Sequence, residues 1–84
     1  MNNTIMRKID VTANWAALSA EELVGTVDIS TPPGNTGPVQ FRGDDDSEVP
    51  WIPGEYHTLH GINLAEIFIK GTPGDTVTVV GGSW

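Results

Sequence analysis

The chain has 84 residues, no cysteine and a formal net charge of −7, from eleven acidic against four basic residues. The length predicts one domain, and the lack of cysteine excludes disulfides and thiolate metal sites. The acidic balance disfavours binding to nucleic acid or to an anionic membrane surface, because both need basic patches. Since a domain of this size buries a limited core, we expect it to self-associate.

The composition also argues against helix and against a membrane span. Ten glycines and six prolines against 18% charged residues favour turn-rich β structure. No segment approaches the roughly 20 apolar residues that cross a bilayer. Arg7 and Lys8 are not followed by the apolar core of a signal peptide. We therefore expect a protein that is made in a cytoplasm and stays soluble or joins an assembly.

The first third of the chain predicts two strands with an irregular segment between them. Residues 1–13 and 23–30 alternate apolar with polar side chains, which is typical of half-buried strands. Between them, Ser19 and Glu22 fit a helix capping box, which predicts at most one helical turn. Gly25 indicates a β-bulge or a close backbone contact.

A loop rich in proline and glycine follows over residues 31–38, TPPGNTGP. Its prolines cannot donate to a sheet ladder, and its length predicts either a crossing between two sheets or an exposed arm. Residues 39–42 predict a short strand with Val39 and Phe41 facing inward. Prolines confine the extended segment 48–52 to a sheet edge or a bulge.

The last third, residues 54–84, carries the densest strand pattern. Pro53-Gly54 and Pro73-Gly74 fit the central pairs of tight turns. We expect the second turn to close a hairpin, and residues 61–66 to form a bend or one 3₁₀ turn. The strands predicted here cover residues 55–60, 67–70 and 76–80.

Together these elements predict an all-β fold, a small antiparallel β-sandwich or barrel. Residues 1–38 are expected to form an extended N-terminal strand and arm region. Residues 39–84 are expected to form the sandwich module of the same single domain, residues 1–84.

The segments RGDDDSEVPWIPGEYHTL, INLAEIFIKG and TPGDTVTVVGG resemble a module of small tailed-phage and prophage virion proteins, notably capsid decoration (cement) proteins. In that module a charged turn leads to a Val-Pro dipeptide, a Pro-Gly-Glu turn and two apolar strands. The resemblance covers residues 39–84, and residues 1–38 match nothing in it. It implies a β-sandwich that binds the major capsid protein, with no catalytic residue and no cofactor.

One acidic cluster has the spacing of a cation site. Asp44, Asp46 and Glu48 follow a D-x-D-x-E pattern of oxygen ligands that suits calcium. A solvated turn explains the same residues, because Asp is favoured in turns for its local hydrogen bonds. The further ligands of a calcium loop are missing, so we expect the turn and no bound metal.

The residues suited to catalysis do not form a recognisable pattern. His57 and His60 lie three apart in a predicted strand, so their side chains point to opposite faces and are poor joint ligands. Ser47, His57 and Asp75 supply the parts of a triad, but nothing places Ser47 on a nucleophile elbow. We therefore expect a protein that is not an enzyme.

Three tryptophans stand out in so short a chain, and one or two of them are expected to fill the core. Trp51 lies among prolines and Trp84 ends the chain, so both are expected to be exposed. Exposed tryptophans anchor protein interfaces or stack on sugar rings. With the stiff loop, which loses less entropy on docking, the predicted protein interface comprises Trp15, Trp51, Trp84, Pro32, Pro33 and Pro38.

The leading hypothesis is a decoration protein on the virion surface that self-associates as a homodimer or homotrimer and stabilises capsomer junctions. One alternative is a tail, neck or head-fibre component of a phage. The other is a carbohydrate-binding module that uses Trp51 and Trp84 as stacking platforms.

Overall fold

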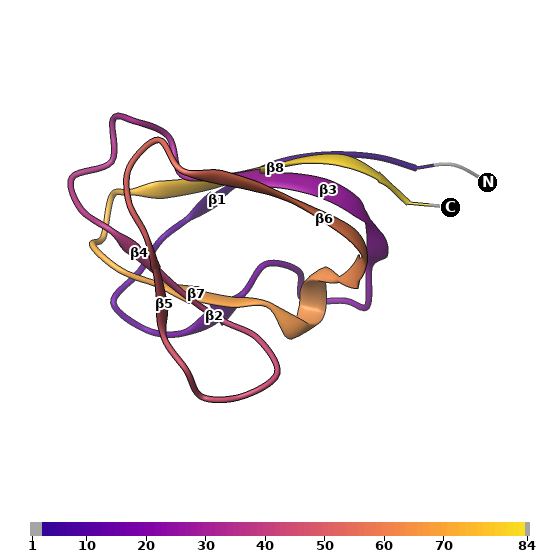
Figure 1. Ribbon diagram of the computed structural model, residues 1–84, viewed down its shortest axis with the longest axis horizontal. Coiled ribbons are helices and arrows are strands. Elements are labelled where there is room, and N and C mark those ends of the chain that lie inside the picture. Colours follow the sequence, from indigo (N-terminus) through magenta and orange to yellow (C-terminus); the bar gives the residue numbers. More distant parts are fainter. Residues whose placement is uncertain (1–2, 84) are drawn as a thin grey trace.

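The structure confirms the predicted all-β class: two antiparallel sheets of four strands pack against each other (Figure 1). It is a computed structural model and describes residues 3–83. Sheet A has the strand order β1-β8-β3-β6, and sheet B has the order β2-β7-β4-β5. The elements are β1 (Asn3–Asp10), β2 (Ala16–Ala17), β3 (Val24–Ser30), β4 (Val39–Arg42), β5 (Val49–Trp51), β6 (Tyr56–Asn63), the 3₁₀ turn η1 (Leu64–Glu66), β7 (Phe68–Lys70) and β8 (Thr76–Ser83).

The core lies between the sheets and is built by alternation along the strands. In β8 the valines Val77 and Val79 are fully buried, while Thr76 and Thr78 face the other side, as predicted. Burying one such side chain contributes about 1.5–3 kcal/mol. The buried apolar residues are Ile5, Val11, Leu18, Val27, Ile29, Val39, Phe41, Trp51, Leu64, Ile69, Val77 and Val79.

The two central strands of sheet A, β3 and β8, approach each other at glycines. A Cβ added at Gly25 would lie 2.5 Å from the carbonyl oxygen of Gly82, and one added at Gly81 would collide with the backbone of Thr26 and Val27. The pairing of β3 with β6 also shifts register between Gly25 and Val27. Of the two alternatives for Gly25, the close backbone contact is confirmed. The bulge lies in the opposite strand, because β6 advances three residues, from Leu59 to Ile62, where β3 advances two.

Both tight turns are formed at the predicted proline-glycine pairs. Gly54 has a φ of 88° and Gly74 a φ of 98°. The N–H of Glu55 donates to the Ile52 carbonyl at 3.0 Å, and the N–H of Asp75 donates to the Thr72 carbonyl at 3.1 Å. A positive φ at the third residue with this hydrogen bond is the type II geometry.

The second turn does not close a hairpin, which corrects the prediction. β7 pairs with β2 and β4 in sheet B, whereas β8 pairs with β1 and β3 in sheet A. Residues 71–75 therefore carry the chain from one sheet to the other. The loop 31–38 does the same between β3 and β4, so of its two predicted roles the crossing is the one found.

The segment before β3 has no helical turn, which corrects the capping-box prediction. The Ser19 hydroxyl donates to the Glu21 carbonyl at 2.7 Å, and the Glu21 N–H donates back to this oxygen at 3.3 Å. This local turn competes with helix formation. The predicted 3₁₀ turn is found at η1, where the Asn63 side chain accepts from the Ala65 N–H at 3.0 Å.

The N-terminal region is paired rather than extended away from the sandwich. β1 pairs with β8 from Asn3 to Asp10, and β3 lies between β8 and β6. Residues 1–38 thus supply two of the four strands of sheet A. Among residues 3–83, no helix is long and apolar enough to cross a membrane.

We predict that Gly81→Ala unfolds at a denaturant midpoint well below that of the parent protein. Its Cβ has no room between β8 and β3, and overpacking at such a contact costs about 1–3 kcal/mol. Gly34→Ala is the matched control, because a Cβ at Gly34 has no neighbouring atom within 4 Å. Equal urea midpoints for the two variants would show that the glycine contact does not limit the packing of sheet A.

Candidate binding surface

The outer face of sheet B carries a cluster of two aromatic and two basic side chains, named here the cation–aromatic face: Trp15, Arg42, Phe68 and Lys70. The Arg42 guanidinium carbon lies 4.4 Å from the Trp15 ring centroid and 5.5 Å from that of Phe68. The Lys70 ammonium lies 4.9 Å from the Trp15 centroid. The face therefore gathers two of the four basic residues of an acidic chain around one half-buried tryptophan.

Strand register explains how these residues meet. Arg42 follows buried Phe41 in β4, so it points away from the core, and its partner across the β4–β7 ladder is Phe68. Ala16 pairs with Ile69 in the β2–β7 ladder. One step further along this antiparallel register places Trp15 opposite Lys70.

The acidic turn, residues 43–48, borders this face and partly neutralises it. The Lys70 ammonium lies 3.7 Å from a Glu48 carboxylate oxygen, and the Arg42 guanidinium lies 3.9 Å from Asp46. Exposed ion pairs contribute about 0–1 kcal/mol, and exposed cation–π contacts about 0.5–1 kcal/mol. These contacts orient the basic side chains, but each one is weak. A partner can therefore displace the acidic residues.

Two of the three candidate cation ligands, Asp46 and Glu48, pair with basic side chains instead of converging on one point. Asp45 adopts the turn conformation, accepting from the Ser47 N–H at 2.7 Å, and this hydrogen bond lowers the pKa of its carboxyl. Asp46 and Glu48 face the two basic residues. Within residues 3–83, no group of three or more histidine or acidic side chains is placed to hold a metal ion.

Trp51 is buried, so the prediction that it is exposed is wrong. Only 8% of its surface is accessible, and its ring stacks on Phe41 with 3.7 Å between centroids and 17° between planes. The reason is register: Trp51 pairs with Val39, which is fully buried, and cross-strand partners face the same side of a sheet. The flanking prolines restrict the pairing of β5 but do not turn its last side chain outward.

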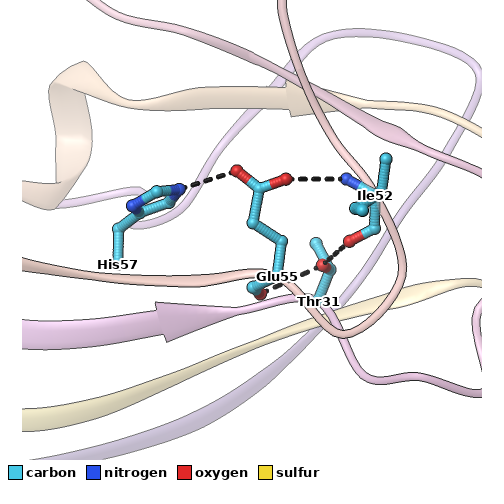
Figure 2. Close-up of polar contacts among 4 residues, drawn as sticks. All are labelled: Thr31, Ile52, Glu55 and His57. Carbon is cyan, nitrogen blue, oxygen red and sulfur yellow. Dashed lines mark hydrogen bonds and ion pairs between the residues drawn. The ribbon is translucent and has the colours of Figure 1, made fainter.

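Beside Trp51, the turn into β6 is held by the network drawn in Figure 2. The Glu55 carboxylate accepts from the Ile52 N–H at 3.0 Å and lies 2.7 Å from the His57 ring nitrogen. The bonds to His57 and to Ile52 hold the pKa of Glu55 below its usual range. The Thr31 hydroxyl donates to the carbonyls of Ile52 and Glu55, at 2.7 and 3.2 Å.

The residues that a catalytic or metal site would need together have different partners in the structure. The His57 ring meets Trp51 edge-on, 4.7 Å between centroids, while His60 is exposed further along β6. Asp75 is engaged by Thr36 and Gly37, and His57 by Glu55. The three residues that could supply a catalytic triad, Ser47, His57 and Asp75, therefore do not form one.

The proline-rich loop 31–38 is fastened to the sandwich, so the arm, the second of its two predicted roles, is not formed. Asn35 exchanges two hydrogen bonds with the backbone of Thr76, at 2.9 and 3.0 Å. The buried Asp75 carboxylate accepts from the N–H of Thr36 at 2.9 Å and of Gly37 at 3.3 Å. Of the interface prolines, Pro33 and Pro38 are exposed and Pro32 is partly buried.

Of the three predicted interface tryptophans, only Trp15 lies on a solvent-facing surface within the described residues, and Trp84 lies outside them. Sequence reasoning missed Arg42, Phe68 and Lys70. A signal for them was available, because each alternates with an inward-facing residue in a predicted strand. Their convergence depends on the β4–β7 pairing, which no local pattern encodes.

Comparison with protein families, curated proteins and solved structures found no match to this chain. The resemblance to phage virion proteins therefore rests on the residues of the chain alone.

We predict that acid destabilises the protein through Asp75. The backbone N–H of Thr36, together with the Thr36 hydroxyl and the Gly37 N–H, lowers the pKa of this carboxyl below its ordinary value of 3.8. A lowered pKa in the folded state gives stability above the unfolded-state pKa, which is lost as the pH falls through the folded-state pKa. The melting temperature should therefore drop when the pH is lowered from about 5 to about 2.

Asp75→Asn should lower the melting temperature at neutral pH and reduce its dependence on acid, because the amide loses the charge that these donors stabilise. Asp44→Asn in the exposed turn is the control at neutral pH. An Asp75→Asn protein as acid-sensitive as its parent would assign the acid effect to other carboxyls.

Proposed function

We propose that this chain is a non-enzymatic structural protein that binds a larger protein assembly through the cation–aromatic face. The observation that carries the proposal is the contact of the Trp15 ring with both Arg42 and Lys70 on the outside of sheet B. Tryptophan and arginine are among the residues enriched at interface hot spots. A partner that covers this face buries a large aromatic ring and receives two oriented cations.

The assembly that we propose is the capsid of a tailed phage, with the major capsid protein as the partner and the virion surface as the location. Support comes from the sequence resemblance over residues 39–84. Three of the four residues of the face, Arg42, Phe68 and Lys70, lie within the segments that carry it. A decoration protein in this position stabilises capsomer junctions by burying surface between subunits, and symmetry repeats the contribution of each copy.

The geometry is compatible with one of the two alternative functions and weakens the other. A tail, neck or head-fibre component could use the same face, and copy number per particle separates that location from a capsid coat. The carbohydrate-binding alternative loses one of its two stacking platforms, because Trp51 is in the core. We therefore propose no sugar-binding role.

We predict that Trp15→Ala weakens co-sedimentation with capsids of the phage that encodes the chain by about tenfold or more, the loss expected for a hot spot of 2 kcal/mol or greater. The control is Met6→Ala, which removes a side chain of 73% exposure from sheet A. The melting temperatures of both variants establish that they are folded.

Quantitative mass spectrometry of purified particles then tests the location. Copies in the hundreds per particle support a coat, whereas a handful of copies would place the protein in the tail or neck. Loss of binding in Met6→Ala but not in Trp15→Ala would move the docking surface from sheet B to sheet A. Failure of the parent protein to bind capsids or tails would overturn the proposed function.

The proposal includes self-association as a homodimer or homotrimer. A chain of this size buries only about 60% of its unfolded surface, and further burial between copies adds stability. Light scattering at micromolar concentration should give a mass two or three times the 9.0 kDa of one chain. A monomeric mass that persists at tenfold higher concentration would contradict this part.

A further inference from the structure

The four sheet edges formed by the described residues are protected to very different degrees. β1 carries Arg7, Lys8 and Asp10, β2 has two residues, and β5 has three residues with Pro50 in the middle. Charged residues, short length and proline are the devices that keep edges from pairing with another chain. β6, with the sequence YHTLHGIN, has eight residues and no acidic residue, lysine, arginine or proline.

The hydrogen-bonding groups that β6 offers can be assigned from its register with β3. The Thr31 N–H donates to the Glu55 carbonyl, and the same antiparallel register continues through the pairs Ile29–His57 and Val27–Leu59. Because backbone groups alternate in direction along a strand, the N–H and C=O groups of Tyr56, Thr58 and His60 point away from β3. These three residues form a short outward ladder, which ends at the bulge around Gly61.

An open apolar pocket of about 260 Å³ lies beside this edge. Its lining includes Leu59 of β6, Val49 and Trp51 of β5, and Ile29 and Phe41 of the core strands. It therefore occupies the seam where the edges of the two sheets come together. Pockets for drug-sized ligands run from about 300 to 1,000 Å³, so this one suits a single apolar side chain better than a separate small molecule.

We propose that β6 is a docking edge for an extended segment of a partner protein, which adds as a fifth strand to sheet A and places one apolar side chain in this pocket. Main-chain bonds to Tyr56, Thr58 and His60 give affinity, and the pocket selects the side chain, as in other cases of strand addition. This goes beyond the proposed function, because the docking strand belongs to sheet A and requires no capsid; Arg42 is the one residue that the pocket shares with the cation–aromatic face.

Charge specifies the partner further. The acidic turn borders the pocket at Gly43, and its exposed side chains include Asp44, Asp45 and Asp46. Arg42 also lines the pocket, but the Asp46 carboxylate lies 3.9 Å from its guanidinium, so acidic side chains outnumber the single basic one here. The chain as a whole has a net charge of −7. The incoming segment should therefore have basic residues next to its apolar anchor.

A second copy of this chain fits the site less well than such a segment. If two β6 strands paired about a two-fold axis, each Leu59 would stay in its own core and neither pocket would be filled. The two acidic turns would also add like charges to the interface.

The test uses the full chain and a synthetic peptide about eight residues long, with threonine alternating with valine, a central phenylalanine and a lysine at each end. Binding is followed by tryptophan fluorescence, since Trp51 lines the pocket, and by amide exchange. We expect saturable binding, and slower exchange of the Tyr56, Thr58 and His60 amides than in the free protein. No binding at about millimolar peptide, a range that covers weak complexes, or protection elsewhere only, would overturn the proposal.

The matched variants are Thr58→Pro and Thr58→Ala. Both remove the side-chain bond to Asp28, but only proline removes the outward N–H, a position at which an edge strand tolerates it. Thr58→Pro should weaken peptide binding by about tenfold, the effect of losing about 1.4 kcal/mol, while Thr58→Ala stays close to the parent. If Thr58→Pro does not fold, the exchange pattern of the parent protein still decides the question.

Two further outcomes are informative. Trp15→Ala should bind the peptide like the parent, so that failure of capsid docking and failure of the β6 edge are distinguishable. A dimer that is dispersed by Thr58→Pro, with no peptide binding by the parent, would assign the edge to a second copy and overturn the proposed partner. A peptide with terminal glutamates in place of lysines should bind more weakly than the basic one, and equal affinity would contradict the charge specificity.

Discussion

The buried carboxylate of Asp75 is the contact on which the arrangement of the two sheets depends. It lies at the end of the β7–β8 crossing and accepts hydrogen bonds from Thr36 and Gly37 in the β3–β4 crossing. One step on, Asn35 bonds to both backbone groups of Thr76. The two crossings that carry the chain between sheets A and B are thus tied to each other. Because a buried carboxylate is costly unless it is satisfied, both crossings must adopt this geometry together.

These hydrogen bonds between the crossings also affect both candidate surfaces, the cation–aromatic face and the β6 edge. The β3–β4 crossing begins at Thr31, whose hydroxyl donates to the carbonyls of Ile52 and Glu55 in the turn between β5 and β6 (Figure 2). It therefore helps to position the start of the edge strand β6. The same crossing ends at β4, which presents Arg42 to the outer face of sheet B. The β7–β8 crossing follows directly after Lys70, the last residue of β7, whose ammonium contacts the same Trp15 ring as Arg42. Two surfaces on different sheets therefore share one polar anchor, and loosening that anchor should disturb both.

The sequence predicted those features that local chemistry decides. Alternation in 76–80 correctly assigned the inward valines, and Pro53-Gly54 and Pro73-Gly74 correctly marked type II turns. The hairpin prediction failed because a type II turn is equally compatible with a hairpin and with a crossing. What decides between them is the non-local pairing of β7 with β4 and of β8 with β3. Trp51 shows the same limit, since its burial follows from pairing with Val39 and not from its proline neighbours.

The distribution of charge also gives a reason why this chain can expose one edge strand. An uncharged edge promotes aggregation when copies of a protein can pair through it. In this protein the acidic residues lie around the β6 edge instead of on it: the acidic turn borders the pocket at Gly43, and Glu55 precedes the strand. Two copies that approach edge to edge bring these carboxylates together, whereas a basic segment is attracted to them. The acidic surroundings of β6 can therefore oppose self-pairing while leaving its backbone groups open to a partner of the opposite charge.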